Sequence, residues 1–426
     1  MNSSRARTLE RALEKIRDDE ALNAWSHLAI DEARSAAIES DARLASGAPR
    51  SAIEGRLVAL KGNIAVRGWP YEGGLLNRRG IVAEHDAALV RRLREAGAVL
   101  LGQTRMDAGA LGAEGRSIDG PIRNPRRPTH SVGGSSGGSA AALAAGHIDL
   151  AVGTDTIGSV RIPASYCGIA SLKPSPDLIA LEGILPVHPD FDHAGPMTSR
   201  AELLRPLLCV LAGLTHSTSS PVYPNVDQLL GSRSIGFMVD VERLGGTPNV
   251  IQHYRRGLDR LRSLGATLVP IDLTPLDPVK TRRAVFSLCE HAMAEQHRDE
   301  LARKPEHYSS ELRAMLDYGA SLTPVKLDEY RSRVRHFAHA VHRLMLPLAA
   351  LVLPTTPGQA FDYDGPTPTD LADLTVIATA AGLPAASVPL STGNNLPVGL
   401  QIVTARGEDL LACDLASQFE SAAHSA

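Results

Sequence analysis

The sequence predicts an α/β protein: a single large domain in which a central twisted mixed β-sheet has helices on both faces. Two observations support this prediction. Short apolar runs of strand character alternate with stretches of helical spacing, and this alternation occurs towards both ends of the chain. Aromatic residues make up only 4% of the 426 residues while Ala, Gly and Leu are abundant, which suits helices packed closely against a sheet.

The first hundred residues follow this alternation. Helical spacing over residues 4–46 predicts two helices, and the run 56–60 predicts a short strand that leads into Lys61. A further helix is expected over residues 86–96, followed by a buried strand at 99–101. This order of elements is typical of an α/β sheet.

Two loops rich in Gly, Ser and Thr enclose the next helix and strand. The first covers residues 131–139 and runs into an alanine-rich helix that starts at Ala140. The second, at 153–159, follows an apolar strand at 148–152. Because catalytic groups usually lie on loops held by a rigid scaffold, we expect both loops to contribute to a site.

We expect residues 1–426 to form one domain with three parts. A core spans about residues 55–200, and a more helical part that faces the substrate spans about 205–345. A C-terminal part at about 346–405 returns to the sheet. The chain has no internal repeat and no low-complexity linker that would divide it.

Composition and charge argue against several classes of function. With 44 basic and 47 acidic side chains, the chain lacks the basic footprint of a nucleic-acid-binding protein. It has no apolar run of membrane-spanning length and no apolar signal segment near Met1, so we expect a cytoplasmic protein. The four cysteines are far apart, which predicts free thiols. His291, Glu295 and His297 do not have H-E-x-x-H spacing, so no metal site is expected.

The segment 133–139 admits four interpretations. It is a poor flexible linker because ordered elements adjoin it, and it lacks the Gly-Lys-Ser/Thr ending of a phosphate loop. It matches the G-x-S-x-G nucleophile elbow of an α/β-hydrolase around Ser135, but two prolines precede it where a strand is required. We favour a loop whose glycines permit unusual backbone angles, so that a serine faces a site.

The second loop and Lys61 are weak signals when each is taken alone. Residues 153–163 form a small-residue turn that presents Ser159, and backbone N–H groups in such a turn can converge on an oxyanion. A lysine that closes a buried strand ordinarily keeps its charge in water. If Lys61 is instead held inside the protein, desolvation lowers its pKa and makes it a usable base.

Taken together, Lys61, the loop 133–139 and the loop 153–163 resemble the amidase signature family. The separation of Ser135 and Ser159 (159 − 135 = 24) also fits that family. The similarity extends over about residues 22–403. It implies the hydrolysis of a small, polar amide to a carboxylate and ammonia or an amine, without a cofactor or a metal.

The resemblance also implies a Ser–cisSer–Lys triad. Ser159 would attack the amide carbonyl, and Ser135, after a cis Gly134–Ser135 bond, would pass the proton to neutral Lys61. Residues 106–113 would line the pocket. The other implied site residues are the oxyanion-hole group Thr156, Ile157 and Gly158 with the N–H of Ser159, and the outer or substrate-binding group Ser136, Gly133, Ala110 and Arg161.

Two departures from the family pattern leave a second hypothesis open. Gly62 replaces the usual Asp after the lysine, and Ile157 replaces a usual Gly. Ile157 should narrow the site, and it would be strained if its position needs a positive φ. The alternative is a non-catalytic or ammonia-donating subunit, like that of an amidotransferase, that works with a partner protein. Otherwise we expect a small-molecule amide as the partner, no nucleic acid, no membrane and, by resemblance to the family, a homodimer.

Overall fold

The apolar runs of the sequence pair into one eleven-stranded sheet. The computed structural model describes residues 4–214, 226–390, 393 and 396–424. In order across the sheet, the strands are β1 (Trp25–Leu28), β3 (Val99–Thr104), β2 (Leu57–Lys61), β6 (Leu150–Asp155), β8 (His193–Thr198), β7 (Ala170–Lys173), β12 (Ala385–Leu390), β13 (Val398–Thr404), β11 (Leu348–Pro354), β9 (Ser234–Met238) and β10 (Leu268–Ile271). A separate small hairpin pairs β4 (Arg116–Ser117) with β5 (Gly120–Pro121).

The sheet is mixed, and its central strands come from both ends of the chain. Strand β2 is parallel to β3 and β6, whereas β8, β7, β12 and β13 pair in antiparallel fashion. Strands β9 and β10 then run parallel to β11 at the far edge. Every residue of β2, β6, β8, β11 and β13 is buried, as expected for strands covered on both faces.

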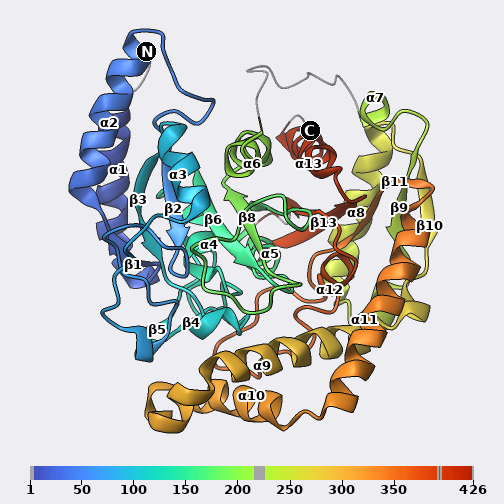
Figure 1. Ribbon diagram of the computed structural model, residues 1–426. Coiled ribbons are helices and arrows are strands. Elements are labelled where there is room, and N and C mark those ends of the chain that lie inside the picture. The colour runs from blue at the N-terminus through green and yellow to red at the C-terminus, as the bar shows by residue number, and fades with distance from the viewer. Residues whose placement is uncertain (1–3, 215–225, 391–392, 394–395, 425–426) are drawn as a thin grey trace.

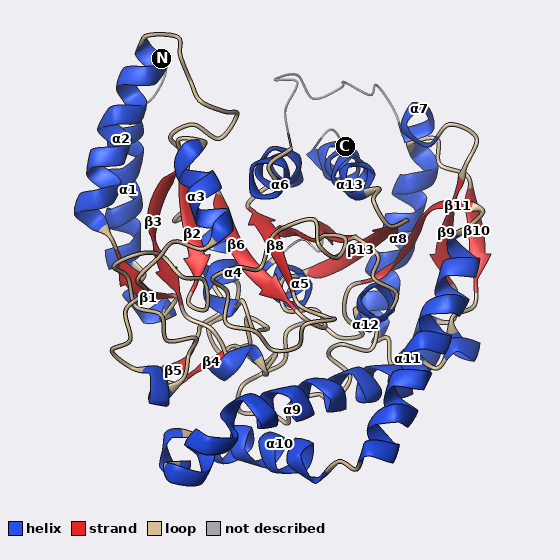
Figure 2. Ribbon diagram, in the orientation of Figure 1, coloured by secondary structure: helices blue, strands red, loops and turns tan. Residues whose placement is uncertain are grey.

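Helices cover both faces of the sheet (Figure 2). Helices α6 and α13 lie on one side of it, and α4 and α5 lie on the other (Figure 1). The helices are α1 (Arg5–Asp18), α2 (Ile30–Ala45), α3 (Ala88–Glu95), α4 (Gly137–Ala144), α5 (Arg161–Cys167), α6 (Leu204–Ala212), α7 (Val226–Leu230), α8 (Pro248–Ser263), α9 (Pro278–Arg303), α10 (Ser310–Ser321), α11 (Pro324–Met345), α12 (Val376–Ala380) and α13 (Asp409–His424). The predicted fold class, an α/β protein with a large mixed sheet between helices, is confirmed.

One element near the N-terminus differs from the prediction. Residues 4–46 hold two helices, but strand β1 lies between them. Its backbone pairs antiparallel with β3, so it forms the edge of the sheet. Trp25 and Leu28 fit a helical spacing by coincidence, and the long-range pairing with β3 decides their conformation.

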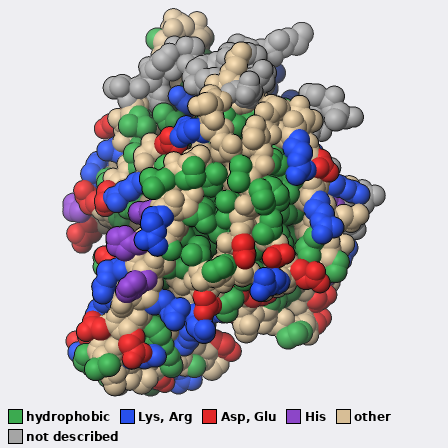
Figure 3. Space-filling model, turned by 90° about the vertical axis from the view of Figure 1, so that its right-hand side faces the viewer, with side chains coloured by type: hydrophobic (Ala, Val, Ile, Leu, Met, Phe, Trp, Pro, Cys, Tyr) green, Lys and Arg blue, Asp and Glu red, His purple; other side chains and the backbone are tan. Residues whose placement is uncertain are grey.

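A layer of three long helices extends below the sheet. Helices α9, α10 and α11 form the lower part of the molecule in Figure 1, and α9 packs against α10, α11 and α12. Viewed from the side of β10 and α11, hydrophobic side chains gather in the middle of the surface and charged side chains surround them (Figure 3). Among the described residues, no helix is long and apolar enough to cross a membrane.

Candidate active site

The two Gly/Ser loops meet because of the direction of two neighbouring strands. Strands β2 and β6 are parallel neighbours, so their carboxyl ends lie at the same edge of the sheet. Lys61 ends β2, and Asp155 ends β6 just before the turn that leads to Ser159. Ligands of α/β sheets commonly bind at such carboxyl ends.

Lys61 is fully buried at this edge, and its ammonium nitrogen contacts two hydroxyl groups. Its Nζ lies 2.7 Å from Ser135 Oγ and 2.8 Å from Thr154 Oγ1, and a longer contact of 3.4 Å reaches the Thr154 carbonyl. Burial lowers the pKa of Lys61 to about 7, although the carboxylates of three aspartates oppose that shift. These aspartates are Asp107, Asp155 and Asp192. Near neutral pH the amine can therefore accept a proton from Ser135.

Two hydrogen bonds from Ser136 hold the Ser135 loop against strand β6 and the turn that follows it. The Gly134–Ser135 peptide bond is cis. The N–H of Ser136 donates to the carbonyl of Ser159 at 3.1 Å, and Ser136 Oγ donates to the Thr154 carbonyl at 3.3 Å. These bonds tie the first serine loop directly to the second. No strand lies between Pro121 and Ser135, so the loop is not the strand–turn–helix elbow of an α/β-hydrolase.

Asp107 supports the Ser135 loop from the other side, whereas the sequence placed it only within the segment 106–113 that was expected to line the pocket. Its carboxylate accepts backbone N–H groups from Glu114, Gly115 and Arg116 at 3.0–3.2 Å. A Cβ on Gly134 would lie 2.0 Å from Asp107 Oδ2, so only glycine fits there. Burial raises the pKa of Asp107 to about 6. Asp107 therefore joins the wall of the pocket to the serine loop.

The turn before Ser159 presents the serine at the floor of a pocket. Ser159 is buried, with 8% of its surface exposed. Gly158 has φ +153°, and a Cβ there would lie 2.5 Å from Thr375 Oγ1. The Ile157 carbonyl accepts a hydrogen bond from Thr375 Oγ1 at 2.5 Å, and Thr156 Oγ1 donates to Asp192 Oδ1 at 2.7 Å.

The structure removes the concern about strain at Ile157. Among the described residues with positive φ, the non-glycine ones are Asn23, Ala110, Asp177, Asp240 and Asp277, so Ile157 is not one of them. Its side chain instead forms part of the pocket wall. Gly62 makes backbone contacts with Thr104, and a Cβ there would approach Met106.

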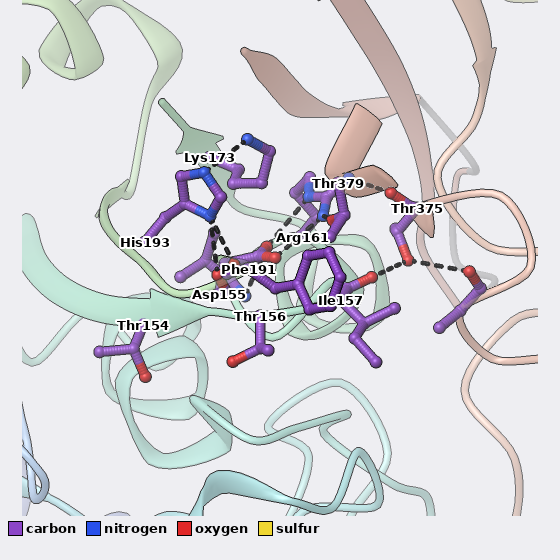
Figure 4. A network of polar contacts seen from close by, with 12 residues as sticks. Thr154, Asp155, Thr156, Ile157, Arg161, Lys173, Phe191, His193, Thr375 and Thr379 are labelled. Atoms are coloured by element: carbon purple, nitrogen blue, oxygen red, sulfur yellow. Dashed lines mark hydrogen bonds and ion pairs between the residues drawn. The ribbon is translucent and has the colours of Figure 1, made fainter. Parts of the chain in front are cut away.

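Arg161 lies behind the turn and is completely buried (Figure 4). Its guanidinium makes a bidentate ion pair with Asp155, at 3.0 Å from Nε and 2.9 Å from Nη2. The remaining N–H groups donate to the carbonyl of Thr375, the side chain of Gln401 and the hydroxyl of Thr379. All five donors are used inside the protein, so none is left for a substrate. Of the two roles considered for Arg161, holding the loop is the one that this geometry allows.

A second buried lysine stands behind Asp155, in a network that no local pattern of residues predicts. Lys173 Nζ donates to the Pro174 carbonyl at 2.7 Å and lies 3.4 Å from His193 Nε2. Burial lowers the pKa of Lys173 to about 7 and that of His193 to about 3. His193 Nδ1 reaches the Phe191 carbonyl at 2.7 Å (Figure 4). The whole network fixes β6, β7 and β8 around the turn.

A cavity of about 280 Å³ opens over Ser159. Its floor comes from the turn at 156–159, one wall comes from residues 110–114, and the other wall comes from α9, α10 and residues 367–372. Of the candidate residues, Ala110, Thr156, Ile157, Gly158 and Ser159 line it. The cavity is slightly smaller than the range of about 300–1,000 Å³ that is typical of ligand pockets.

The remaining candidate residues lie outside the cavity. Gly133 is buried with φ +72°, and a Cβ there would lie 3.0 Å from the Pro163 backbone. Met106 and Asp107 lie behind the wall that residues 110–113 form. His291 and His297 make separate contacts, to the Gly319 carbonyl and to the Tyr308 hydroxyl. The described residues include no cluster of three or more side chains suited to a metal ion.

Known proteins resemble this chain over most of its length. The Amidase family matches residues 7–413 of the chain. The chain belongs to the amidase signature family. Its structural relatives include enzymes named amidase, peptide amidase and aryl acylamidase.

Curated relatives in this family are components of an amidotransferase. The chain is 31% identical to a glutamyl-tRNA(Gln) amidotransferase subunit of Methanothermobacter thermautotrophicus, over 94% of this chain and 92% of the relative. It is 32% identical to the equivalent subunit of Methanospirillum hungatei, over 86% and 93%. The expectation of a small-molecule partner alone is therefore wrong. These amidase signature relatives bear the name of one component of a larger enzyme.

Solved amidase signature structures share the fold closely. A structure described as an amidase superposes with a TM-score of 0.88 at 31% identity and covers 98% of this chain and 96% of its own. A structure with a TM-score of 0.88 and 28% identity, covering 98% and 94%, comes from a study of a vestigial protein complex and the origin of an s-triazine catabolic enzyme.

Proposed function

We propose that this chain is an amide-hydrolysing subunit that releases ammonia or an amine through an acyl-enzyme on Ser159 and acts together with a partner protein. The buried contact of 2.7 Å between Lys61 Nζ and Ser135 Oγ is the observation that supports the chemistry. The names of the curated relatives support the partner.

In the first step, Ser159 Oγ forms a bond to the amide carbonyl carbon. The Ser159 proton passes to Ser135 Oγ while the Ser135 proton passes to neutral Lys61 Nζ, so the relay ends with a lysine cation. The carbonyl oxygen becomes an oxyanion, and in this proposal the backbone N–H groups of residues 156–159 donate hydrogen bonds to it. The hydrogen bond from Thr375 to the Ile157 carbonyl holds that turn.

In the second step, the C–N bond breaks. The proton returns from Lys61 through Ser135 to the leaving nitrogen, which departs as ammonia or an amine. Water then loses a proton to the same relay and attacks the acyl carbon, and Ser159 regains its proton as the carboxylic acid leaves. No charge is left in the buried relay at the end of the cycle.

Active-site labelling tests this chemistry. We expect a small alkyl fluorophosphonate to add to Ser159, as measured by peptide mass spectrometry. Labelling should disappear in Ser159→Ala and should slow by at least about 100-fold in Lys61→Ala, because the relay loses its base. Labelling of Ser135 instead, or no labelling of the folded protein, would contradict the proposal.

Isolation of the protein from its native host tests the partner. We expect a gently purified, tagged chain to elute together with a second polypeptide, and amide hydrolysis to rise when that polypeptide is added back. Full activity of the chain alone, with no polypeptide bound, would contradict this part of the proposal while leaving the Ser159 chemistry intact.

A further inference from the structure

The charged side chains that line the Ser159 cavity are already paired with opposite charges. Within the described structure these lining residues are Glu114, Arg282 and Arg283. A substrate that brings its own charge needs a free opposite charge in the wall, because a buried and unpaired ion is strongly disfavoured. The partners of these three side chains therefore decide which amides the cavity can accept.

Arg282 is occupied by a buried carboxylate. Its Nε lies 2.7 Å from Asp373 Oδ1, and only 5% of the Asp373 side chain is exposed. Arg282 comes from α9, and Asp373 comes from the segment just before α12. The ion pair therefore joins two elements of the wall and leaves Asp373 little access to water.

Arg283 is held in a similar way from the same helix. Its Nη2 lies 3.4 Å from Glu290 Oε2, and 4% of the Glu290 side chain is exposed. The guanidinium also lies over the ring of Tyr318, 4.5 Å from its centre. Burial raises the pKa of Glu290 to about 7, so this pair is fully charged in the same alkaline range in which Lys61 is neutral.

The third charge is paired as well, and most of the other side chains in the wall are apolar. Glu114 Oε2 lies 3.2 Å from Arg116 Nε. The larger apolar wall residues include Leu111, Ile157, Ile162, Phe286, Met315 and Leu371. Contact between this wall and a hydrocarbon group of a substrate is favourable in free energy. A charged group would lose its hydrating water there without gaining an opposite charge in exchange.

We propose that the cavity selects uncharged amides with a compact apolar acyl group, and that Asp373 and Glu290 determine this specificity by occupying Arg282 and Arg283. The inference rests on the proposed hydrolysis at Ser159. A carboxylate on the substrate would have to displace a buried carboxylate of the protein, and an ammonium group would meet no free anion. An anionic amide therefore finds no free cation in the wall, because Asp373 and Glu290 already neutralise Arg282 and Arg283.

Binding to the Ser159→Ala protein tests this selection without catalysis. Isobutyramide, succinamate and glutamine are all small primary amides, but they differ in charge: isobutyramide is neutral, succinamate is anionic and glutamine is zwitterionic. At about pH 8.5, where the pairs are charged, we expect isobutyramide to bind at least about 10-fold more tightly than either charged amide by titration calorimetry. Tighter binding of succinamate or glutamine, or no binding of isobutyramide, would overturn the inference.

Two isosteric variants test the role of the carboxylates. We expect Asp373→Asn and Glu290→Gln, each in the Ser159→Ala background, to improve the binding of succinamate relative to isobutyramide by about 10-fold, because each variant frees a guanidinium. Glu295→Gln is the control, because it removes the same charge from an exposed position of α9 that pairs with Arg298. If Glu295→Gln improved the binding of succinamate relative to isobutyramide equally, the assignment of this specificity to Asp373 and Glu290 would be overturned.

Turnover by the wild-type enzyme separates this inference from the proposed function. Hydrolysis of succinamate or glutamine in preference to isobutyramide would overturn the inference and leave Ser159 as the nucleophile. Selective binding of isobutyramide to a protein whose Ser159 is not labelled by a fluorophosphonate would support the selection and contradict the proposed chemistry.

Discussion

At the scale of single residues, Lys61 has to satisfy two requirements that conflict. The relay needs an amine that is neutral near pH 7, and burial supplies it by lowering the pKa of Lys61 to about 7. The same burial removes a charged group from water, which costs stability in the folded state. In the described structure, the short contacts of Lys61 Nζ that offset this cost are those to the hydroxyl groups of Ser135 and Thr154.

The first prediction concerns the pH dependence of the reaction. Because the neutral form of Lys61 is the base, kcat/KM should fall about 10-fold for each pH unit below about 7 and should level off above it. The measurement is kcat/KM for a neutral amide from about pH 5.5 to 9. A rate that does not change across this range, with chemistry rate-limiting, would show that Lys61 is not the base.

The second prediction concerns stability. The pKa of Lys61 in the folded protein lies below its ordinary value of 10.5, so between about pH 7 and 10.5 the unfolded chain holds a proton that the folded protein has lost. This group therefore makes the protein more stable as the pH rises through that window. Lys61→Met should be inactive, yet more stable than wild type at pH 7 by about 1–2 kcal/mol.

Chemical denaturation of both proteins at several pH values measures this difference. The difference in the free energy of unfolding between Lys61→Met and wild type should shrink as the pH rises towards 10, because burial of Lys61 then destabilises the wild-type protein less. A difference in the free energy of unfolding that stays constant with pH would indicate that Lys61 has an ordinary pKa in the folded protein.

At the scale of elements, the turn between β6 and α5 depends on contacts that are far apart in the sequence. Asp155 and Arg161 form an ion pair across this turn, and Thr375 and Gln401 receive the other donors of Arg161. The sequence located the two Gly/Ser loops to within a few residues, since their composition is local information, but α4 begins at Gly137 and β6 continues to Asp155. It could not show Asp107, Thr375 or the pairing of β1 with β3, because each depends on segments that only the folded chain brings together.

The third prediction tests this ion pair. Arg161→Met leaves the buried Asp155 without its ion-pair partner and with one hydrogen bond from the Val160 N–H, so it should lower the free energy of unfolding by about 3–5 kcal/mol. Arg262→Met is the matched control, because Arg262 pairs with Asp259 on the surface of α8 and should change stability by less than about 1 kcal/mol. Urea denaturation of both variants measures the difference. Similar losses in the two variants would mean that the buried pair has no special role.

At the scale of the whole molecule, the sheet and the helical layer contribute different parts of the cavity. Strand β2 ends at Lys61 and β6 leads into the turn that presents Ser159, the two residues that we propose act on the reacting bond. Helices α9 and α10 supply Phe286 and Met315 to the wall that meets the rest of the substrate. The chemistry and the acyl preference should therefore respond to different substitutions.

The fourth prediction is that Met315→Ala changes the acyl preference and leaves the nucleophile unaffected. Removing the Met315 side chain enlarges the far wall, so kcat/KM for hexanamide relative to isobutyramide should rise about 5- to 10-fold, mainly through KM. The rate at which a small fluorophosphonate labels Ser159 should stay within about 2-fold of wild type, because the relay through Ser135 and Lys61 is intact. Val279→Ala is the control, since Val279 lies on α9 but is exposed and outside the cavity. A Met315→Ala protein that loses labelling and hydrolysis of both amides together would show that the helical layer also shapes the catalytic floor.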